Sequence, residues 1–280
     1  MRFGFHISIG GGISKTVERA NKKGCETIQI FSRNPRGWRY NPLDPLQVKK
    51  FRGDVNLSKI FPLFIHMPYL PNLASPKEDI YYKSIESLIE DLKRAEMMGA
   101  SFLIIHSGNG METDENDAIN NIASGINKAF LKVENNVSLL LENNAGQGSE
   151  IGYSFSNIQS IIERVDQGER VGVCLDTAHA FAAGYDLSTR DGLNATLDEF
   201  DRLIGITKLH LIHLNDSKTP LGSRVDRHWH IGEGEIGIKG FENIVNHPLL
   251  IRLPGIMETP FTKDADDIKN MAVIRNLVRR

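Results

Sequence analysis

The sequence has few cysteines and no long apolar run, and each of these absences excludes a class of protein. Only two of its 280 residues are cysteine, too few for the disulfide framework of a small secreted domain. No stretch approaches the roughly 20 apolar residues that span a bilayer. The N-terminus also lacks the apolar segment of a secretory signal. We therefore expect a cytoplasmic protein that does not interact with a membrane.

The chain also has almost no net charge. Its 33 basic and 35 acidic residues leave a formal charge of −2, so any contact with nucleic acid requires a local basic patch. Hydrophobic residues make up 40% of the chain, which is enough for one sizeable core. The length does not demand two domains, because a (β/α)₈ barrel takes about 250 residues as a single domain.

A short apolar run recurs along the sequence and ends each time on a residue that can bind a metal. The runs recur every 34 to 45 residues, and a βα unit with its loops takes roughly 30 or more residues. Two further strand candidates, residues 2–8 and 27–31, precede them, which makes eight strands. The six terminal residues are His66, His106, Glu142, Asp176, His213 and Glu258.

Alternating strand and helix patterns predict an α/β fold, a (β/α)₈ TIM barrel formed as a single domain by residues 1–280. The clearest helix is expected from Pro76 to Met98, with Ser75 as N-cap and Gly99 as C-cap. Other helices are expected around 118–130, 158–162, 193–203 and 264–280. The segments expected to be irregular are 32–60, 67–75, 107–113, 143–153 and 214–235.

The barrel prediction brings the six strand-end residues together, because the C-terminal ends of all strands meet at one face. Three imidazoles and three carboxylates at that face predict a metal site, since buried charges are costly unless paired or metal-bound. His179, Asp226 and His228 follow strands in the sequence and could form another zinc site with an open position. Manganese and iron are the rival metals.

Other candidate residues do not follow the strand-end pattern. We expect structural roles for His6 and His210. Residues 232–237 match G-x-G-x-x-G, but a polar loop precedes them, so the match is expected to be chance. The segment 33–39 holds three arginines and Trp38, and could read a nucleic-acid substrate together with residues 67–70.

Four segments of the sequence form long and specific motifs: Glu142–Gly148 (ENNAGQG), Asp176–Asp186 (DTAHAFAAGYD), His213–Asp216 (HLND) and Ser223–His228 (SRVDRH). They resemble the endonuclease IV family, the zinc-dependent abasic-site endonucleases also called AP endonuclease family 2. The similarity extends from the first strand to Glu258.

The resemblance implies a barrel with three zinc ions per chain, with manganese possible at one site. It assigns His66, His106 and Glu142 to the first ion. Glu142 is shared with the second, which adds Asp176, His213 and Glu258. The third takes His179, Asp226 and His228. Glu142 and Glu258 are the expected catalytic residues.

The resemblance also implies a substrate, duplex DNA containing abasic sites. Arg36, Tyr69 and Leu70 match the residues that penetrate the duplex. The implied reaction cleaves the phosphodiester 5′ to the abasic site and leaves a 3′-hydroxyl and a 5′-deoxyribose phosphate. The resemblance also implies a phosphodiesterase activity that removes blocking groups from the 3′ ends of DNA. A monomer associated with the nucleoid is expected.

Some residues depart from the family pattern. Ser107 stands where the family usually has proline, and Met67 and Pro71 alter the loop around Tyr69. These departures affect the expected loop geometry and damage preference.

Two other function classes are compatible with parts of the sequence. Sugar isomerase or epimerase barrels share Glu142, Asp176, His213 and Glu258, which would hold one divalent metal. That alternative leaves the other candidate ligands unused. A non-catalytic DNA-binding protein would bind DNA without metal dependence.

Overall fold

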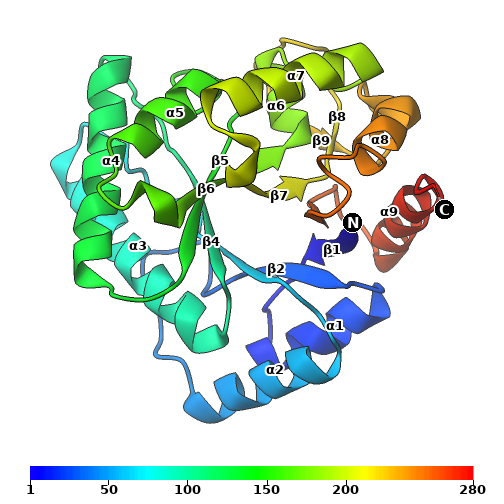
Figure 1. Ribbon diagram of the computed structural model, residues 1–280. Helices are drawn as coiled ribbons and strands as arrows, with labels where there is room; N and C mark the ends of the chain where they lie inside the picture. Colours follow the sequence, from blue (N-terminus) through cyan, green and yellow to red (C-terminus); the bar gives the residue numbers. More distant parts are fainter. Residues whose placement is uncertain (280) are drawn as a thin grey trace.

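The computed structural model describes residues 1–279 and shows a closed barrel of eight parallel strands ringed by helices (Figure 1). Each strand pairs in parallel with its two neighbours, in the order β1-β10-β7-β6-β5-β4-β3-β2. This confirms the predicted (β/α)₈ fold. The barrel strands are β1 (Arg2–His6), β2 (Thr27–Phe31), β3 (Leu63–His66), β4 (Phe102–His106), β5 (Ser138–Glu142), β6 (Val171–Asp176), β7 (Leu209–His213) and β10 (Pro254–Met257).

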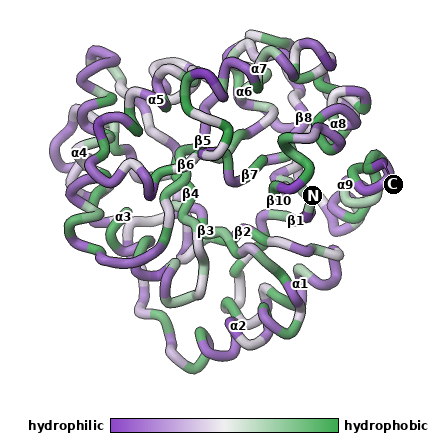
Figure 2. The backbone as a smooth tube through the Cα atoms, viewed as in Figure 1, coloured by the Kyte–Doolittle hydropathy of each residue, from purple (hydrophilic) through white to green (hydrophobic). Residues whose placement is uncertain are grey.

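Helices alternate with the strands and cover the outside of the barrel. Most of them bury an apolar face against the strands and leave a polar face outside (Figure 2), whereas α6 is buried along most of its length. In the 21-residue helix α3, for example, Ile85, Leu88 and Leu92 are buried at helical spacing. The helices are α1 (Thr16–Lys22), α2 (Pro45–Leu57), α3 (Glu78–Met98), α4 (Glu115–Lys132), α5 (Phe155–Glu163), α6 (Thr177–Ala183), α7 (Arg190–Leu203), α8 (Gly237–Val245) and α9 (Asp264–Asn276).

Several element boundaries differ from the prediction, including the ends of β1 at His6 and of α9 at Asn276; Arg280, in the predicted last helix, lies outside the described residues. Helix α3 begins at Glu78, because the Ser75 hydroxyl accepts a hydrogen bond from the backbone N–H of Lys77 in a turn that precedes the helix. The segment 32–60 contains helix α2, whose first turn is capped by Asp44. The segment 214–235 contains a short antiparallel pair, β8 (Asp216–Ser217) and β9 (His228–Trp229).

An apolar layer fills the barrel just below the strand ends. Its members each stand two positions before a strand-end residue, so the two-residue period of a strand points them into the same interior. Burial raises the pKa of the Cys174 thiol to about 12, and Cys174 therefore acts as a small apolar side chain. The layer consists of Phe64, Ile104, Leu140, Cys174, Leu211 and Ile256.

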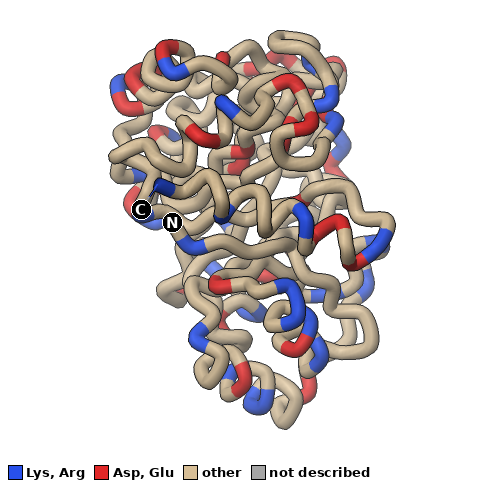
Figure 3. The backbone as a smooth tube through the Cα atoms, turned by 90° about the vertical axis from the view of Figure 1, so that its right-hand side faces the viewer, with Lys and Arg blue, Asp and Glu red and all other residues tan. Residues whose placement is uncertain are grey.

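The outer surface carries both signs of charge. Acidic and basic residues are interspersed over the side shown in Figure 3. This agrees with the near-zero net charge of the sequence. Within residues 1–279, no helix has the length and apolar character that crossing a membrane requires.

Candidate functional site

Glu142 is the centre around which the strand ends converge. It is fully buried at the end of β5. Its Oε2 atom lies 3.0 Å from His66 Nε2 and 3.7 Å from His106 Nε2. Its Oε1 atom lies 3.0 Å from His213 Nδ1. One carboxylate therefore touches imidazoles from three other strands: Oε2 faces those of β3 and β4, and Oε1 faces that of β7.

Asp176 and Glu258 complete this cluster. Asp176 Oδ2 and Glu258 Oε2 lie 3.7 Å and 3.2 Å from His213 Nδ1. The structure therefore brings together all six strand-end residues that the sequence pattern selects. Ligand atoms of Glu142, Asp176, His213 and Glu258 all lie within 4.8 Å of one another, and so do those of His66, His106 and Glu142.

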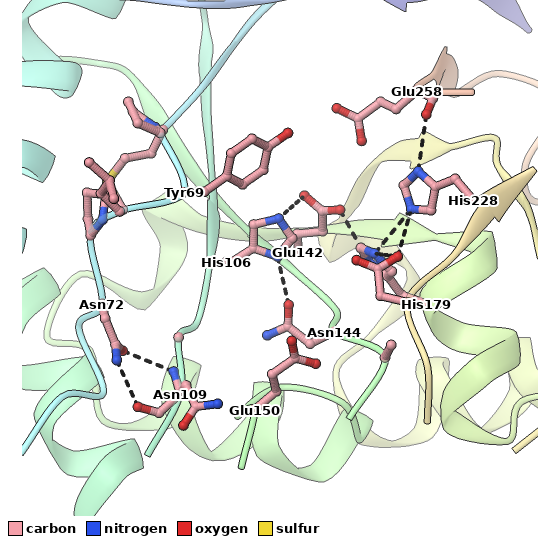
Figure 4. A pocket seen from close by; sticks show the side chains of 17 residues that line it. Tyr69, Asn72, His106, Asn109, Glu142, Asn144, Glu150, His179, His228 and Glu258 are labelled. Carbon is pink, nitrogen blue, oxygen red and sulfur yellow. Dashed lines mark hydrogen bonds and ion pairs between the residues drawn. The ribbon is translucent and has the colours of Figure 1, made fainter. Parts of the chain in front are cut away.

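His179, Asp226 and His228 form a second cluster beside the first. His179 lies in the first turn of α6, where its backbone N–H binds the Asp176 carboxylate that caps the helix. Its Nε2 atom is 3.2 Å from His228 Nε2 and 3.4 Å from Asp226 Oδ1. The third side of this triangle, His228 Nε2 to Asp226 Oδ1, is 3.5 Å. Figure 4 shows His179 and His228 next to each other on one side of the pocket.

Each of the five imidazoles has one ring nitrogen fixed by a carbonyl oxygen. A carbonyl oxygen only accepts, so the nitrogen facing it carries the proton and the other nitrogen keeps its lone pair for the cluster. The five contacts are His66 Nδ1 to Met67 O, His106 Nδ1 to Asn144 Oδ1, His179 Nδ1 to Asn143 O, His228 Nδ1 to Glu258 O and His213 Nε2 to Gln29 Oε1, at 2.6 to 3.2 Å.

These donor atoms fit a metal ion. Two ligands on one tetrahedral zinc lie about 3.3 Å apart, for zinc–ligand bonds of about 2.0–2.1 Å. The distances across both clusters, 3.0 to 3.7 Å, are close to that value. Lone pairs that face one another and face carboxylate oxygens repel unless a cation lies between them. The chemistry of the donor set therefore matches a cluster of divalent cations.

The carboxylates of Glu142 and Asp226 are ionised. Burial alone would raise the pKa of Glu142, but the imidazoles of His213 and His106 outweigh burial and hold that pKa well below its usual range. Burial is outweighed in the same way at Asp226, where the adjacent imidazoles of His179 and His228 lower the pKa to about 2. At neutral pH these groups bear negative charge, which a divalent cation neutralises.

His6 belongs to the site, contrary to the structural role expected for it. Strand β1 ends at His6, two residues before the predicted end of the strand, so His6 is a strand-end residue like the other six. Its Nδ1 atom lies 2.9 Å from Glu258 Oε1. Gln29, on β2, also contacts Glu258. His210 stays outside the site, where its ring packs 5.4 Å from that of Phe102.

A cavity of about 600 Å³ opens above the clusters. Tyr69 and Leu70, which line it, are 63% and 43% exposed. The Tyr69 ring lies 5.8 Å from that of His66, so it stands at the mouth of the barrel beside the centre. Arg36, on the loop between β2 and α2, is exposed as well. The predicted contact residues are therefore available to a ligand.

Arg33 does not take part in this surface, although the sequence placed it in a substrate-reading segment. Its side chain is buried against the Asp91 carboxylate of α3 and donates to Gly37 O at 2.9 Å. Arg94 holds the same loop by donating to the carbonyl oxygens of Ser32 and Asn41. Arg33 therefore fixes the loop that carries Arg36 and cannot reach a ligand.

The glycine-rich segment 232–237 is occupied by a side chain of the protein. The buried carboxylate of Asp216 accepts hydrogen bonds from the backbone N–H groups of Gly232, Gly234 and Ile236 at 2.9 to 3.0 Å. Since those amides are already satisfied, they are not free to bind a phosphate. The expectation that the match to a dinucleotide motif is chance agrees with this arrangement.

Removing the Asp216 carboxylate should destabilise the fold. Asp216→Ala leaves at least three amides without a partner, and each buried unsatisfied group costs about 1–3 kcal/mol. We expect a loss of about 3 kcal/mol or more in the free energy of unfolding, measured with urea. Glu233→Gln, an exposed change in the same segment, should stay within about 0.5 kcal/mol of the wild type. A loss below about 1 kcal/mol for Asp216→Ala would contradict this account.

Comparison with known proteins decides the family. The profile of the Xylose isomerase-like TIM barrel family matches residues 17–273. Probable endonuclease 4 of Halothermothrix orenii is 46% identical over 280 residues, which cover 100% of both chains. The chain belongs to the endonuclease IV family. A second member, Probable endonuclease 4 of Methanoculleus marisnigri, is 47% identical over 98% of both chains.

Solved structures agree with this family assignment. The crystal structure of endonuclease IV from Thermus thermophilus superposes with a TM-score of 0.88 at 36% identity, covering 99% of this chain and 98% of that one. A D-tagatose 3-epimerase-like protein superposes with a TM-score of 0.73 at only 16% identity. That second likeness shows the barrel fold alone.

Proposed function

We propose that the protein is a DNA-repair hydrolase that cleaves duplex DNA at abasic sites, with three zinc ions bound at the mouth of the barrel. Incision is proposed 5′ to the lesion, leaving a 3′-hydroxyl and a 5′-deoxyribose phosphate. The same centre would remove blocking groups from 3′ ends. The observation that carries the proposal is Glu142, whose two oxygens face imidazoles from opposite sides of the barrel. We propose that residues 1–280 act as one catalytic unit and as a monomer.

In this proposal the first cluster supplies two sets of ligands, which share Glu142, and the second cluster supplies a third set. His66, His106 and Glu142 would hold the first ion, with manganese as an alternative to zinc at one site. Glu142 would bridge to the second, which also takes Asp176, His213 and Glu258. His179, Asp226 and His228 would hold the third. Zinc at such sites stabilises charge on phosphate oxygens and lowers the pKa of water to near 7.

The protein's own residues have three tasks in this proposal. Glu142 sets the spacing of the ligand sets, because its short carboxylate reaches both. Glu258, at the edge of the cluster, orients the attacking group towards the phosphate. Arg36, Tyr69 and Leu70 fill the gap left when the abasic nucleotide leaves the helix. That displacement costs least where no base pair exists, which favours abasic sites.

The alternative function is a single-metal sugar isomerase or epimerase. It uses Glu142, Asp176, His213 and Glu258 and has no role for the triangle of His179, Asp226 and His228. The distances in that triangle match ligands on one ion, which favours the nuclease. A metal count separates the two, since the alternative predicts one ion per chain.

An incision assay tests the proposal. The substrate is a duplex with one synthetic abasic site, without added magnesium, and the products are resolved at both ends. We expect 5′ incision with a 3′-hydroxyl, lost after metal stripping and restored by zinc. No incision by a protein that holds one ion per chain would support the isomerase. Binding of the same duplex without metal dependence or incision would support a non-catalytic role.

Replacing Tyr69 tests the contact with DNA. Stacking of an aromatic ring on a base is worth about 1–3 kcal/mol. Tyr69→Ala should therefore raise KM for abasic duplex about 10-fold or more, with little loss of zinc. Steady-state incision at several DNA concentrations measures this. Tyr82→Ala, at an exposed tyrosine on α3, is the control and should leave KM unchanged. An unchanged KM in Tyr69→Ala would remove Tyr69 from the proposed interface.

A further inference from the structure

Gln29 is a buried amide that joins two residues of the cluster. It lies on β2 with no exposed surface. Its Oε1 atom is 2.7 Å from His213 Nε2, and its Nε2 atom is 2.8 Å from Glu258 Oε1. A carboxylate only accepts hydrogen bonds, so the amide nitrogen must face Glu258 and the amide oxygen must face His213. The orientation of Gln29 is therefore fixed at both ends.

The first consequence concerns the proton on His213. Because Gln29 Oε1 accepts, the imidazole donates from Nε2 and keeps a lone pair on Nδ1. That Nδ1 atom lies 3.0 Å from Glu142 Oε1 and 3.2 Å from Glu258 Oε2. Gln29 therefore selects the one tautomer of His213 that can bind a cation in the cluster.

The second consequence concerns the two oxygens of Glu258. Oε1 accepts from Gln29 Nε2 and also faces His6 Nδ1 at 2.9 Å, which must donate to it. Oε2 instead faces His213 Nδ1, on the cluster side. With Oε1 occupied by two donors, Glu258 presents one defined oxygen to the cluster.

Gln29 and His6, which pair in register, are the polar side chains at this depth on β2 and β1. Gln29 pairs in register with Phe64, a member of the apolar layer. Burying an amide is costly unless both of its ends are hydrogen-bonded. An apolar residue would fill this position as Phe64 does on β3, so the packing of the barrel alone does not account for a glutamine here.

We propose that Gln29, supported by His6, is a positioning residue of the metal centre. It fixes the tautomer of His213 and directs a single oxygen of Glu258 at the cluster. Strands β1 and β2, which carry none of the predicted ligands, thereby take part in building the site. This inference rests on the zinc centre of the proposed function.

Zinc binding by variants of the holoenzyme tests the inference. Gln29→Met keeps the length of the side chain and removes both hydrogen bonds. Loss of a group that orients a metal ligand typically costs about 10- to 100-fold in metal affinity or activity. We expect zinc affinity, measured by competition with a chromophoric chelator, to fall by about that factor. For incision of abasic DNA, kcat should fall while KM stays unchanged.

Two further variants keep the experiment decisive. Ile30→Val removes one buried methylene from the same strand, on the face that packs against the helices, and should bind zinc like the wild type. His6→Leu removes one donor to Glu258 at the less buried edge of the site, and should weaken zinc binding less than Gln29→Met. If Gln29→Met does not fold, His6→Leu carries the test.

The outcomes separate this inference from the proposed function. Zinc binding equal to the wild type in Gln29→Met, or in His6→Leu if only that variant folds, overturns the inference. Weaker binding with Ile30→Val unchanged supports it. A wild-type protein that binds zinc and leaves abasic DNA intact overturns the proposed function, while the comparison of zinc affinities still decides the role of Gln29.

Discussion

Glu258→Gln should lower the rate of abasic-site incision by about 10²–10⁴-fold, the range for removing a positioned acid–base group, and leave DNA binding intact. The physical reason lies in the two oxygens of Glu258. Oε1 accepts from His6 and Gln29, so the amide oxygen of the variant would take that place. Its NH₂ group would then face His213 and the cluster, and an amide NH₂ cannot bind a cation.

Single-turnover incision and a binding titration on the same abasic duplex measure the two halves of this prediction. Glu163→Gln, an exposed change of the same type on α5, is the control and should behave like the wild type. Near-normal incision by Glu258→Gln would remove the role given to this carboxylate. Loss of binding together with incision would show that Glu258 supports the DNA-binding face as well.

Glu142→Gln should have the larger effect on the metal content. Oε2 faces His66 and His106, and Oε1 faces His213, so in the proposed centre one substitution would remove a charged ligand from two ions at once. The loss of electrostatic stabilisation is several kcal/mol, about three or more orders of magnitude in rate. Elemental analysis of the purified variant should find fewer zinc ions than in Glu258→Gln.

Thermal unfolding provides an independent measurement for Glu142→Gln. Ions that bind only the folded state stabilise it by mass action, so added zinc should raise the Tm of the variant less than that of the wild type. Full zinc content and a normal zinc-induced shift in Tm would contradict the bridging role of Glu142.

The sequence predicted the six strands that end on a candidate metal-binding residue because two local signals coincide there. Each strand is a short apolar run, and each ends on a side chain that would be costly to bury without a partner. His66 and His106 could be placed beside Glu142 because parallel strands in a barrel end at one face. The distances within the triangle of His179, Asp226 and His228 could not be predicted, because they depend on how the loop before β9 folds.

Two residues of the site, His6 and Gln29, and helix α2 were not identified from the sequence patterns. His6 was assigned a structural role because it does not stand where the pattern of six strands places a ligand; the first strand was predicted to extend to Ser8. Gln29 carries no signal of its own, since a glutamine in a strand is neither a usual metal ligand nor a core residue. Helix α2 was missed because few of its positions are buried: Val48, Phe51 and Val55. Its capping signal, Asp44 before Pro45, was present in the sequence.

The apolar layer beneath the strand ends determines how ions and water can enter and leave. The six apolar side chains of this layer fill the barrel interior directly below the candidate ligands. The described residues therefore open to the cluster from the mouth, under Tyr69, and from a second cavity beside His6 and Glu258. A duplex seated on the mouth would cover the first of these openings. Under the proposed function, exchange of metal ions through the mouth would then slow while DNA is bound, and the cavity beside His6 and Glu258 would be the remaining route when the surrounding solution is depleted of metal.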